Sequence, residues 1–222
     1  MNRTLGIVAL GCILLCTAAL GSGGIYMDSV LLTNNGSPVF SDSFDKATLD
    51  GWKADGTTFV QTQAKPPQYC LYLTRPTRGR CQAQHFLSLD NVGTLELSAW
   101  VYLPPVEQQA TYNDNRCNYA GFCVYAADPK DHISATLFMQ PKGTGYRADA
   151  VWYDQQKNSN VRSYTDKPVL SGGKWARATM RFDPDERTVT LLIDGAMACR
   201  ITYDPSRFKS IGSIMLYSDL WG

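Results

Sequence analysis

The most regular part of the sequence is residues 174–204, in which apolar and polar side chains alternate. Within 176–182, every second residue is small or apolar and the residues between them are charged or polar. A period of two is typical of a strand that packs one face on a core. The alternation stops at Asp-Pro-Asp, 183–185, and resumes over 189–193 until the hairpin signal Asp-Gly at 194–195. The segment therefore predicts three antiparallel strands.

The alternation also fixes which side chains of this segment face inward. Met180, Phe182, Leu191 and Ile193 are its large apolar members, so we expect them in the core. A register shift of one residue would turn all of them outward.

Similar runs, separated by Gly, Pro and Asp turns, cover most of the chain, and no stretch keeps a helical period. The only expected helix is a turn at 204–208. The whole chain therefore reads as all-β, with further strands expected at 39–44, 58–62, 69–74, 81–87, 95–103, 121–126, 132–140, 146–154, 163–168, 197–201 and 211–217.

Three segments resemble parts of the concanavalin A-like lectin/glucanase superfamily, which includes laminin G-like domains and family 16 glycoside hydrolases. They are the Trp-led strands in 174–204, SDSFDKATLDGWK at 41–53 and GTLELSAWVYLP at 93–104. The resemblance implies a two-sheet antiparallel β-sandwich, a jelly roll, over residues 39–222. Members of the superfamily usually continue into a closing strand, which leaves open whether this chain is complete at its C-terminus.

The N-terminus has the features of a secretory signal. A short basic start at 2–3 precedes an apolar run at 5–20 that is too short for a membrane span. Ala19 and Gly21 are the small residues expected before a cleavage site. We therefore expect a signal peptide at 1–21, a linker at 22–38, and a protein that is secreted, periplasmic or on the cell surface.

A lipid anchor is the alternative for this N-terminus. Cys12 and Cys16 each end a segment similar to a bacterial lipoprotein signal. Both depart from that pattern, because Ala9 stands three residues before Cys12 and the bulky Leu15 directly precedes Cys16. A cleaved soluble chain is preferred.

Net charge argues against nucleic acid as a partner. The sequence has 21 basic and 20 acidic side chains, and Arg3 leaves with the expected signal peptide. The remaining chain is electrically balanced, so it lacks the basic excess that attracts DNA, RNA or anionic lipid.

The cysteines beyond the signal predict disulfide bonds, because exported chains meet an oxidising environment. Short separations favour Cys70 with Cys81 and Cys117 with Cys123, although four cysteines permit three pairings. Cys199 lies on an expected strand and reads as a small buried side chain. Zinc is not expected, because no second Cys/His pair has ligand spacing.

The outward rows of two expected strands contain the side chains that bind sugars. Aromatic rings stack on the C–H faces of a sugar, and planar polar groups bond its hydroxyls. We expect Trp100 or Trp175 to be the anchor; the alternative is that these rings are covered or belong to the core. The candidate ligand-binding residues are Glu96, Trp100, Tyr102, Trp175, Arg177 and Arg181.

Sequence patterns that indicate catalysis are weaker than those that indicate sugar binding. The chain has only three glutamates, in separate elements, and lacks the Glu-x-Asp-x-x-Glu strand of family 16 hydrolases, while Asp149 and Asp154 point to opposite faces. Polysaccharide lyases on the resembled fold use Arg, Gln, His and Tyr. In this chain a similar set consists of Tyr102, His132, Gln140, Tyr153 and Arg177, with His132 alternatively a surface residue at a strand start.

Calcium is the one cofactor for which candidate ligands exist. Asp42 and Asp45 near the first strand, and Asp114 in the loop 106–119, supply the hard oxygen atoms that calcium prefers. Asp-rich turns also occur without metal.

The sequence therefore predicts an exported, lectin-like, non-catalytic domain that binds carbohydrate. Two alternatives stay open. One is an enzyme on the same fold, a polysaccharide lyase or hydrolase, and the other is a structural or protein-binding laminin G-like module.

Overall fold

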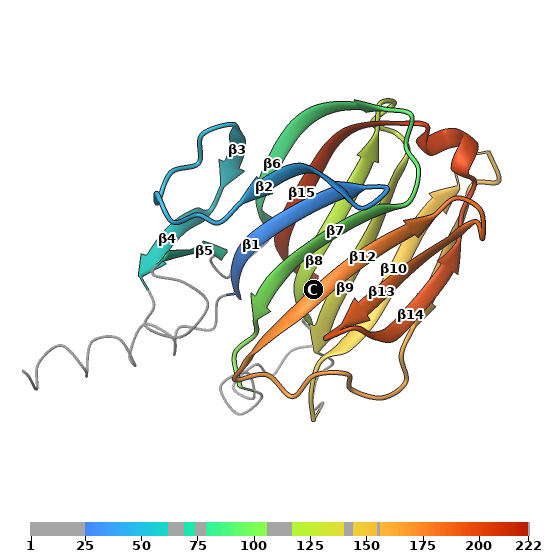
Figure 1. Ribbon diagram of the computed structural model, residues 1–222. Helices are drawn as coiled ribbons and strands as arrows, with labels where there is room; N and C mark the ends of the chain where they lie inside the picture. The colour runs from blue at the N-terminus through green and yellow to red at the C-terminus, as the bar shows by residue number, and fades with distance from the viewer. Residues whose placement is uncertain are drawn as a thin grey trace, which may run out of the picture.

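Two antiparallel sheets face each other across one apolar core (Figure 1). The computed structural model describes residues 25–61, 69–73, 79–105, 117–139, 144–154 and 156–221. Sheet A has the order β14-β13-β12-β7-β1-β5-β4, with β2 paired to β1. Its strands are β1 (Ile25–Asn34), β2 (Ser37–Asp42), β4 (Thr57–Gln61), β5 (Tyr69–Leu73), β7 (Leu95–Tyr102), β12 (Trp175–Asp183), β13 (Thr188–Ile193) and β14 (Ala196–Thr202).

Sheet B has the order β11-β10-β9-β8-β15-β6-β3, so the last strand of the described chain lies in the middle of the sheet. Its strands are β3 (Trp52–Asp55), β6 (Gly79–Asp90), β8 (Cys117–Ala126), β9 (His132–Met139), β10 (Arg147–Asp154), β11 (Ser159–Tyr164) and β15 (Ser210–Trp221). The one described helix is the short 3-10 helix η1 (Pro205–Phe208), at the place where the sequence predicts a helical turn. The all-β sandwich is therefore confirmed.

The hairpins β12–β13–β14 form as their turn residues predict. The side chain of Asp183 accepts hydrogen bonds from the backbone N–H groups of Asp185 and Glu186, which fixes the first turn. Asp194 and Gly195 both have positive φ, the backbone that a tight Asp-Gly hairpin needs. The side chain of Asp194 also accepts a hydrogen bond from the N–H of Arg177.

The predicted core residues lie inward. Met180, Phe182, Leu191 and Ile193 are buried between the sheets. Phe182 packs against the rings of Tyr203 and Phe208, with centroids 5.6 and 6.0 Å away, and so joins sheet A to the connection that contains η1.

Residues 25–38 do not form the expected linker. They form β1, which lies between β7 and β5 in sheet A, and the first residues of β2. The apolar pattern of β1 is irregular because its pairing with β7 shifts between Asp28 and Leu31, where Ser29 has φ 48°. This β-bulge changes the phase of the alternation, so the strand lacks a clean period of two. The sandwich therefore includes residues from Ile25 onward.

The short strand expected at 163–168 is shifted in the structure. β11 covers Ser159–Tyr164 and pairs with β10 from Asp154 back to Asp149. The turn before it contains Asn158 with φ 49°, so the hairpin closes earlier than the Gly and Pro residues of the sequence suggested.

The two expected disulfides are absent among the described cysteines, and Cys70, Cys81, Cys123 and Cys199 are not joined by any disulfide. Cys117 and Cys123 lie six residues apart on the one strand β8. At about 3.3 Å per residue, their Cα atoms are about 20 Å apart, whereas a disulfide needs about 4.4–6.8 Å. Cys70 and Cys81 lie on strands of different sheets. Cys199 is buried in the core cluster, as expected.

The predicted signal peptide, residues 1–21, lies outside the described residues and stays a prediction. Among the residues that the structure describes, no helix has the length and apolar character needed to cross a membrane.

The first prediction tests the register of β12. Phe182→Ala should lower the free energy of unfolding by about 3 to 5 kcal/mol, because it removes buried apolar surface and leaves a cavity beside the rings of Tyr203 and Phe208. The neighbouring Arg181→Ala is the control. Arg181 faces outward with about half of its side chain exposed, so its loss should cost about 0.5 kcal/mol or less. Urea unfolding of both variants measures this, and a larger effect at Arg181 would contradict the register.

Candidate functional site

The outer face of sheet A brings together all six side chains that the sequence proposes for ligand binding. β7 and β12 pair in register, so three cross-strand pairs form. They join Tyr102 with Trp175, Trp100 with Arg177, and Glu96 with Arg181. Trp100, Tyr102 and Trp175 are half-buried and lie outside the core cluster. The aromatic rows therefore belong to the outer face and not to the core.

The polar members of these rows are engaged with each other. Arg177 reaches across β7 and donates hydrogen bonds from Nη1 to the Ser29 carbonyl at 3.3 Å and from Nη2 to Ser98 Oγ at 2.6 Å. Its guanidinium lies 5.9 Å from the Trp100 ring centroid. Arg181 Nε is 3.6 Å from Glu96 Oε1. A ligand on this face would have to compete with these contacts.

An aromatic band crosses four strands of the same face. Tyr26 on β1 lies 4.9 Å from Tyr72 and 5.7 Å from Tyr102, between ring centroids, and Tyr102 lies 5.7 Å from Trp175. Tyr26 is fully buried although it points away from the core. The band stabilises the middle of sheet A, and only its partly exposed rings, Tyr72, Tyr102 and Trp175, could contact a ligand.

Asp28 is a buried carboxyl on this face, next to the bulge in β1. Its Oδ2 accepts a hydrogen bond from Ser29 Oγ at 3.1 Å, and its Oδ1 has no hydrogen-bond partner in the described part of the chain. Burial raises the pKa of Asp28 to about 6, the negative charge of Asp45 adds to the rise, and the hydrogen bonds of Ser29 and the charge of Arg177 oppose it. This carboxyl therefore titrates in a range where an ordinary aspartate is fully ionised.

The outer face of sheet B contains a second group of polar and aromatic side chains. The even-numbered residues of β9, from His132 to Phe138, and the odd-numbered residues of β15, from Ser213 to Tyr217, point away from the core cluster. Several are nevertheless buried, among them Met215 at 2% exposure, Tyr217 at 5% and Thr136 at 8%, and so is Cys123 of the neighbouring strand β8, at 1%. These outward side chains are therefore covered by neighbouring groups, although they lie outside the core between the sheets.

Tyr217 organises the centre of this surface. Its ring lies over Gly121 on the neighbouring strand β8, where a Cβ atom would collide with the ring, so only glycine permits this packing. The guanidinium of Arg80, on β6, lies 4.4 Å from the centroid of the same ring. This cation–π contact holds a positive charge at the surface beside an aromatic face.

Tyr125 and His132 form the adjoining part of the cluster. They are cross-strand partners with ring centroids 5.2 Å apart. The side chain of Tyr125 hydrogen-bonds with Cys123 and Arg80, and burial raises the pKa of its hydroxyl far above the usual range. Burial lowers the pKa of His132, and the positive charge of Arg80 acts in the same direction, while a hydrogen bond of the imidazole with the Lys130 backbone and the charge of Asp131 oppose the shift. His132 is therefore a neutral imidazole near pH 7.

Two buried polar atoms on this face have no partner in the described residues. They are Nδ1 of His132 and Oγ1 of Thr136, on the same face of β9. Buried polar atoms in native proteins are usually hydrogen-bonded, so such exceptions suggest a missing ligand or water. Gln84 on β6, whose Nε2 donates to Ser213 Oγ at 2.9 Å, adds an amide to the same surface.

This cluster was not predicted from the sequence. Its members come from β6, β8, β9 and β15, and β15 lies between β6 and β8 although both of these strands are distant from it in the sequence. The proposed lyase set is not assembled either. Arg177 and Tyr102 lie on sheet A, His132 and Tyr153 lie on sheet B, and Gln140 lies outside the described residues. Only His132 belongs to a cluster, and it is half-buried instead of a surface residue.

The proposed calcium ligands have other contacts. Asp42 accepts hydrogen bonds from the N–H of Phe44 and from Trp52 Nε1, both at 2.8 Å, and these contacts shape the turn after β2. Asp42 and Asp45 line a cavity of about 540 Å³. Within the described ranges no three His, Cys, Asp or Glu side chains group as metal ligands. Asp114 lies outside those ranges.

Comparison with known proteins shows the fold. No known protein family and no curated sequence matches the chain. Among solved structures, the globular domain of T. cruzi calreticulin superimposes with a TM-score of 0.50 at 9% identity, over 78% of this chain and 80% of that one. The β-glucanase of Bacillus licheniformis is also similar, with a TM-score of 0.47 at 11% identity over 90% of this chain and 87% of that one. The carbohydrate binding module CBM66 of Bacillus subtilis has a TM-score of 0.41 at 12% identity over 78% of this chain and 92% of that one.

These neighbours are members of the concanavalin A-like lectin/glucanase fold, as the sequence resemblance implies. Carbohydrate-binding modules, lectins, glycanases and lyases share this fold. The likeness therefore gives the architecture of the chain, and the choice among these activities depends on its side chains.

The second prediction concerns Asp28 and pH. A folded-state pKa above the ordinary value of 3.8 means that the native protein holds this proton more tightly than the unfolded chain does. Stability from Asp28 is therefore full below about pH 4 and is lost as pH rises through about 6. Asp28→Asn removes the ionisation, so its melting temperature relative to the native protein should rise between about pH 4 and pH 7. A difference that stays constant, measured by calorimetry, would contradict this.

Proposed function

We propose that the protein binds carbohydrate on the outer face of sheet B, at the cluster formed by Arg80, Tyr125, His132, Thr136 and Tyr217. The observation that carries the proposal is the presence of two buried, unpartnered polar atoms, His132 Nδ1 and Thr136 Oγ1, on an aromatic surface of β9 and its neighbours. These residues lie four positions apart on β9, about 13 Å at about 3.3 Å per residue. Two different hydroxyl groups of an oligosaccharide, each able to donate and accept, can therefore satisfy the two atoms while a C–H face of a sugar ring contacts an aromatic side chain.

The contrast between the two outer faces supports the choice of sheet B. On sheet A the hydrogen-bonding groups of Arg177, Arg181 and Glu96, the polar residues beside its aromatic rows, are already used within the protein. The unpartnered buried atoms described on that sheet, Asp28 Oδ1 and Thr188 Oγ1, are not among these candidate ligand-binding groups. A ligand there would exchange one polar contact for another and gain little. On sheet B the unpaired groups are buried, where a new hydrogen bond relieves the cost of desolvation. Binding through Trp100 or Trp175 of sheet A stays a prediction that the same experiment tests.

The third prediction separates a binding role from a structural role at Thr136. Thr136→Val keeps the side-chain shape and removes a buried hydroxyl that has no partner, so the melting temperature should stay the same or rise. The affinity for a glycan identified on an array should fall about fivefold, because one hydrogen bond of about 1 kcal/mol is lost. Calorimetric titration and thermal unfolding measure the two effects.

Matched variants on sheet A control this experiment. Thr179→Val changes the same residue type on the outer face of β12 and should leave the affinity unchanged. Trp100→Ala should also leave it unchanged. If Trp100→Ala weakens binding in a folded protein while Thr136→Val does not, the site is on sheet A and the proposal for sheet B is wrong.

A second candidate function is lyase chemistry at the same cluster, because His132 is a half-buried neutral imidazole whose ring contacts the ring of Tyr125, near the Arg80 cation. Lyases cleave uronate-containing polysaccharides by β-elimination. A base removes the proton α to the carboxylate, the glycosidic C–O bond at the β position breaks, and an acid protonates the leaving oxygen. His132 is suited to be the base, Tyr125 the acid, and Arg80 the group that neutralises the carboxylate.

The fourth prediction distinguishes this candidate from binding alone. A lyase generates an unsaturated sugar end that absorbs ultraviolet light, whereas a binding module forms no product. If the protein is a lyase, incubation with alginate or another polyuronate should produce this absorbance, and His132→Asn should abolish it while Thr136→Val only reduces it. Glycan binding without new absorbance or new reducing ends would reject the enzyme and leave the binding module.

A further inference from the structure

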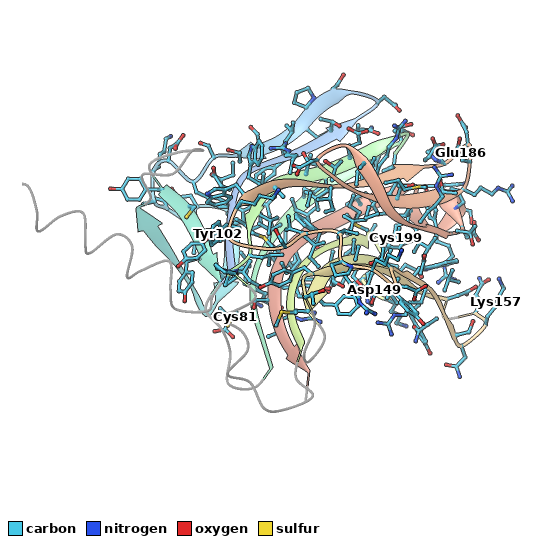
Figure 2. All side chains as sticks on the ribbon, turned by 90° about the horizontal axis from the view of Figure 1, so that it is seen from below. Cys81, Tyr102, Asp149, Lys157, Glu186 and Cys199 are labelled. Atoms are coloured by element: carbon cyan, nitrogen blue, oxygen red, sulfur yellow. The ribbon has the colours of Figure 1, made fainter. Side chains whose placement is uncertain are left out.

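A cleft opens at one end of the sandwich, away from both outer faces. Its volume is about 750 Å³. Sheet A contributes the turn between β12 and β13 and the connection from β14 to η1, while sheet B contributes the turn between β10 and β11. Figure 2 shows Lys157, from the turn of sheet B, and Glu186, from the turn of sheet A, at the same end of the molecule.

Backbone hydrogen bonds hold the walls of this cleft in place. The N–H of Tyr203 donates to the carbonyl of Arg187 at 3.0 Å, and the N–H of Val92 donates to the carbonyl of Lys209 at 3.2 Å. Asp204 caps η1 by accepting from the N–H of Ser206. The cleft is therefore part of the folded scaffold, since each wall is bonded to another segment.

Positive charge exceeds negative charge along the cleft. Four cationic side chains line it, Lys157, Arg187, Arg207 and Lys209, against two lining carboxylates and the adjacent carboxylate of Asp131, which pairs with Arg207. Both lining carboxylates already have protein partners. Asp154 accepts from two backbone N–H groups and lies 3.3 Å from Lys157 Nζ, and Asp204 forms the cap described above.

Arg207 is positioned by a buried carboxylate. Asp131 accepts hydrogen bonds from Arg207 Nε at 2.9 Å and from Nη2 at 2.5 and 2.7 Å. This bidentate pair fixes the plane of the guanidinium. The remaining nitrogen, Nη1, is buried and has no partner among the described residues.

A second unpartnered donor lines the same cleft. Trp152, on β10, is 5% exposed, and its Nε1–H has no hydrogen-bond acceptor in the described chain. A guanidinium nitrogen and an indole nitrogen can only donate. Two buried donors without acceptors, in a cleft with excess positive charge, call for a ligand that accepts hydrogen bonds and carries negative charge.

The rest of the lining suits a sugar ring. Tyr203, Val161, Pro184 and Pro205 supply apolar surface beside the two donors. A free inorganic anion would leave this surface without a contact, whereas the C–H face of a sugar would cover it.

We propose that this cleft binds an acidic sugar residue, with its carboxylate or sulfate ester accepting hydrogen bonds from Arg207 Nη1 and Trp152 Nε1. The anion site follows from the donors and the charge of the cleft, and the sugar part rests on the proposed carbohydrate function. The cleft is separate from the cluster on sheet B, so each can fail without the other.

The test uses the full chain and four small probes: glucuronate, a sulfated glucose, glucose and inorganic sulfate. The indole N–H resonance of Trp152, assigned by its loss in Trp152→Phe, reports on the cleft by nuclear magnetic resonance. Glucuronate or the sulfated sugar should shift this resonance in a saturable way, and glucose should not. Whichever acidic probe shifts it at lower concentration identifies the anion as carboxylate or sulfate.

Charge variants confirm the location. Arg187→Gln combined with Lys209→Gln should weaken binding of the acidic probe about tenfold and reduce its salt dependence. Lys167→Gln, an exposed lysine at the opposite end of β10, is the matched control and should change nothing. Arg207 itself is left intact, because its loss would strand the buried Asp131 charge and unfold the protein.

Three results would overturn the proposal. Absence of any shift of the Trp152 resonance with both acidic probes removes the anion site, whatever happens on sheet B. A shift that the double variant leaves unchanged places the anion elsewhere. If inorganic sulfate binds as tightly as the acidic sugars, the cleft is an anion site that does not recognise the sugar ring. Binding of acidic sugars by a protein in which Thr136→Val has no effect supports the cleft and contradicts only the cluster on sheet B.

Discussion

The pairing of β7 with β12 in one sheet, and of β8 with β15 in the other, is the constraint on which the rest of the structure depends. In a paired strand each step of one residue moves a side chain from the core to the outer face. Ala178 and Met180 therefore fill the core because Arg177 and Thr179 face outward. On sheet B the same rule buries Phe122 and places Cys123 outside. The candidate binding residues of this protein are therefore the side chains that alternate with the core residues along each strand and lie on the outer faces of the two sheets.

The sequence predicts which side chains face the core and which face outward where turn residues close to the strand fix its register. The turns that join β12, β13 and β14 contain Asp and Gly residues that satisfy the backbone locally, and the alternation of β12 agrees with the structure. The pairing of β13 with β14 shifts register between Leu191 and Leu192, and this irregularity leaves Met197 exposed. β1 is the counterexample. Its bulge at Ser29 interrupts the period, and the strand is held by β7 and β5, which are distant in sequence. Pairing between strands that are distant in the sequence depends on tertiary contacts, so it produces no recognisable pattern in the local sequence of β1.

The candidate sites were harder to predict for the same reason. The rows on β7 and β12 were visible because each row lies on one strand, and the structure brings them together. The cluster around Tyr217 required knowing that β15 lies between β6 and β8. The disulfide expectation was wrong because sequence spacing was taken for distance in space, whereas one extended strand keeps Cys117 and Cys123 far apart.

Arginines show why pairing, and not residue type, decides which groups can meet a ligand. Arg177 has its terminal nitrogens bonded to Ser29 and Ser98, whereas Arg207 is fixed by Asp131 and keeps one donor without a partner. Asp131 directly precedes His132, so one short segment borders both the cleft and the outer face of sheet B. The charge of Asp131 raises the pKa of His132 against the effect of burial. Asp131 thus acts in both places, because it fixes the Arg207 guanidinium in the cleft and its charge acts on His132 on the outer face of sheet B.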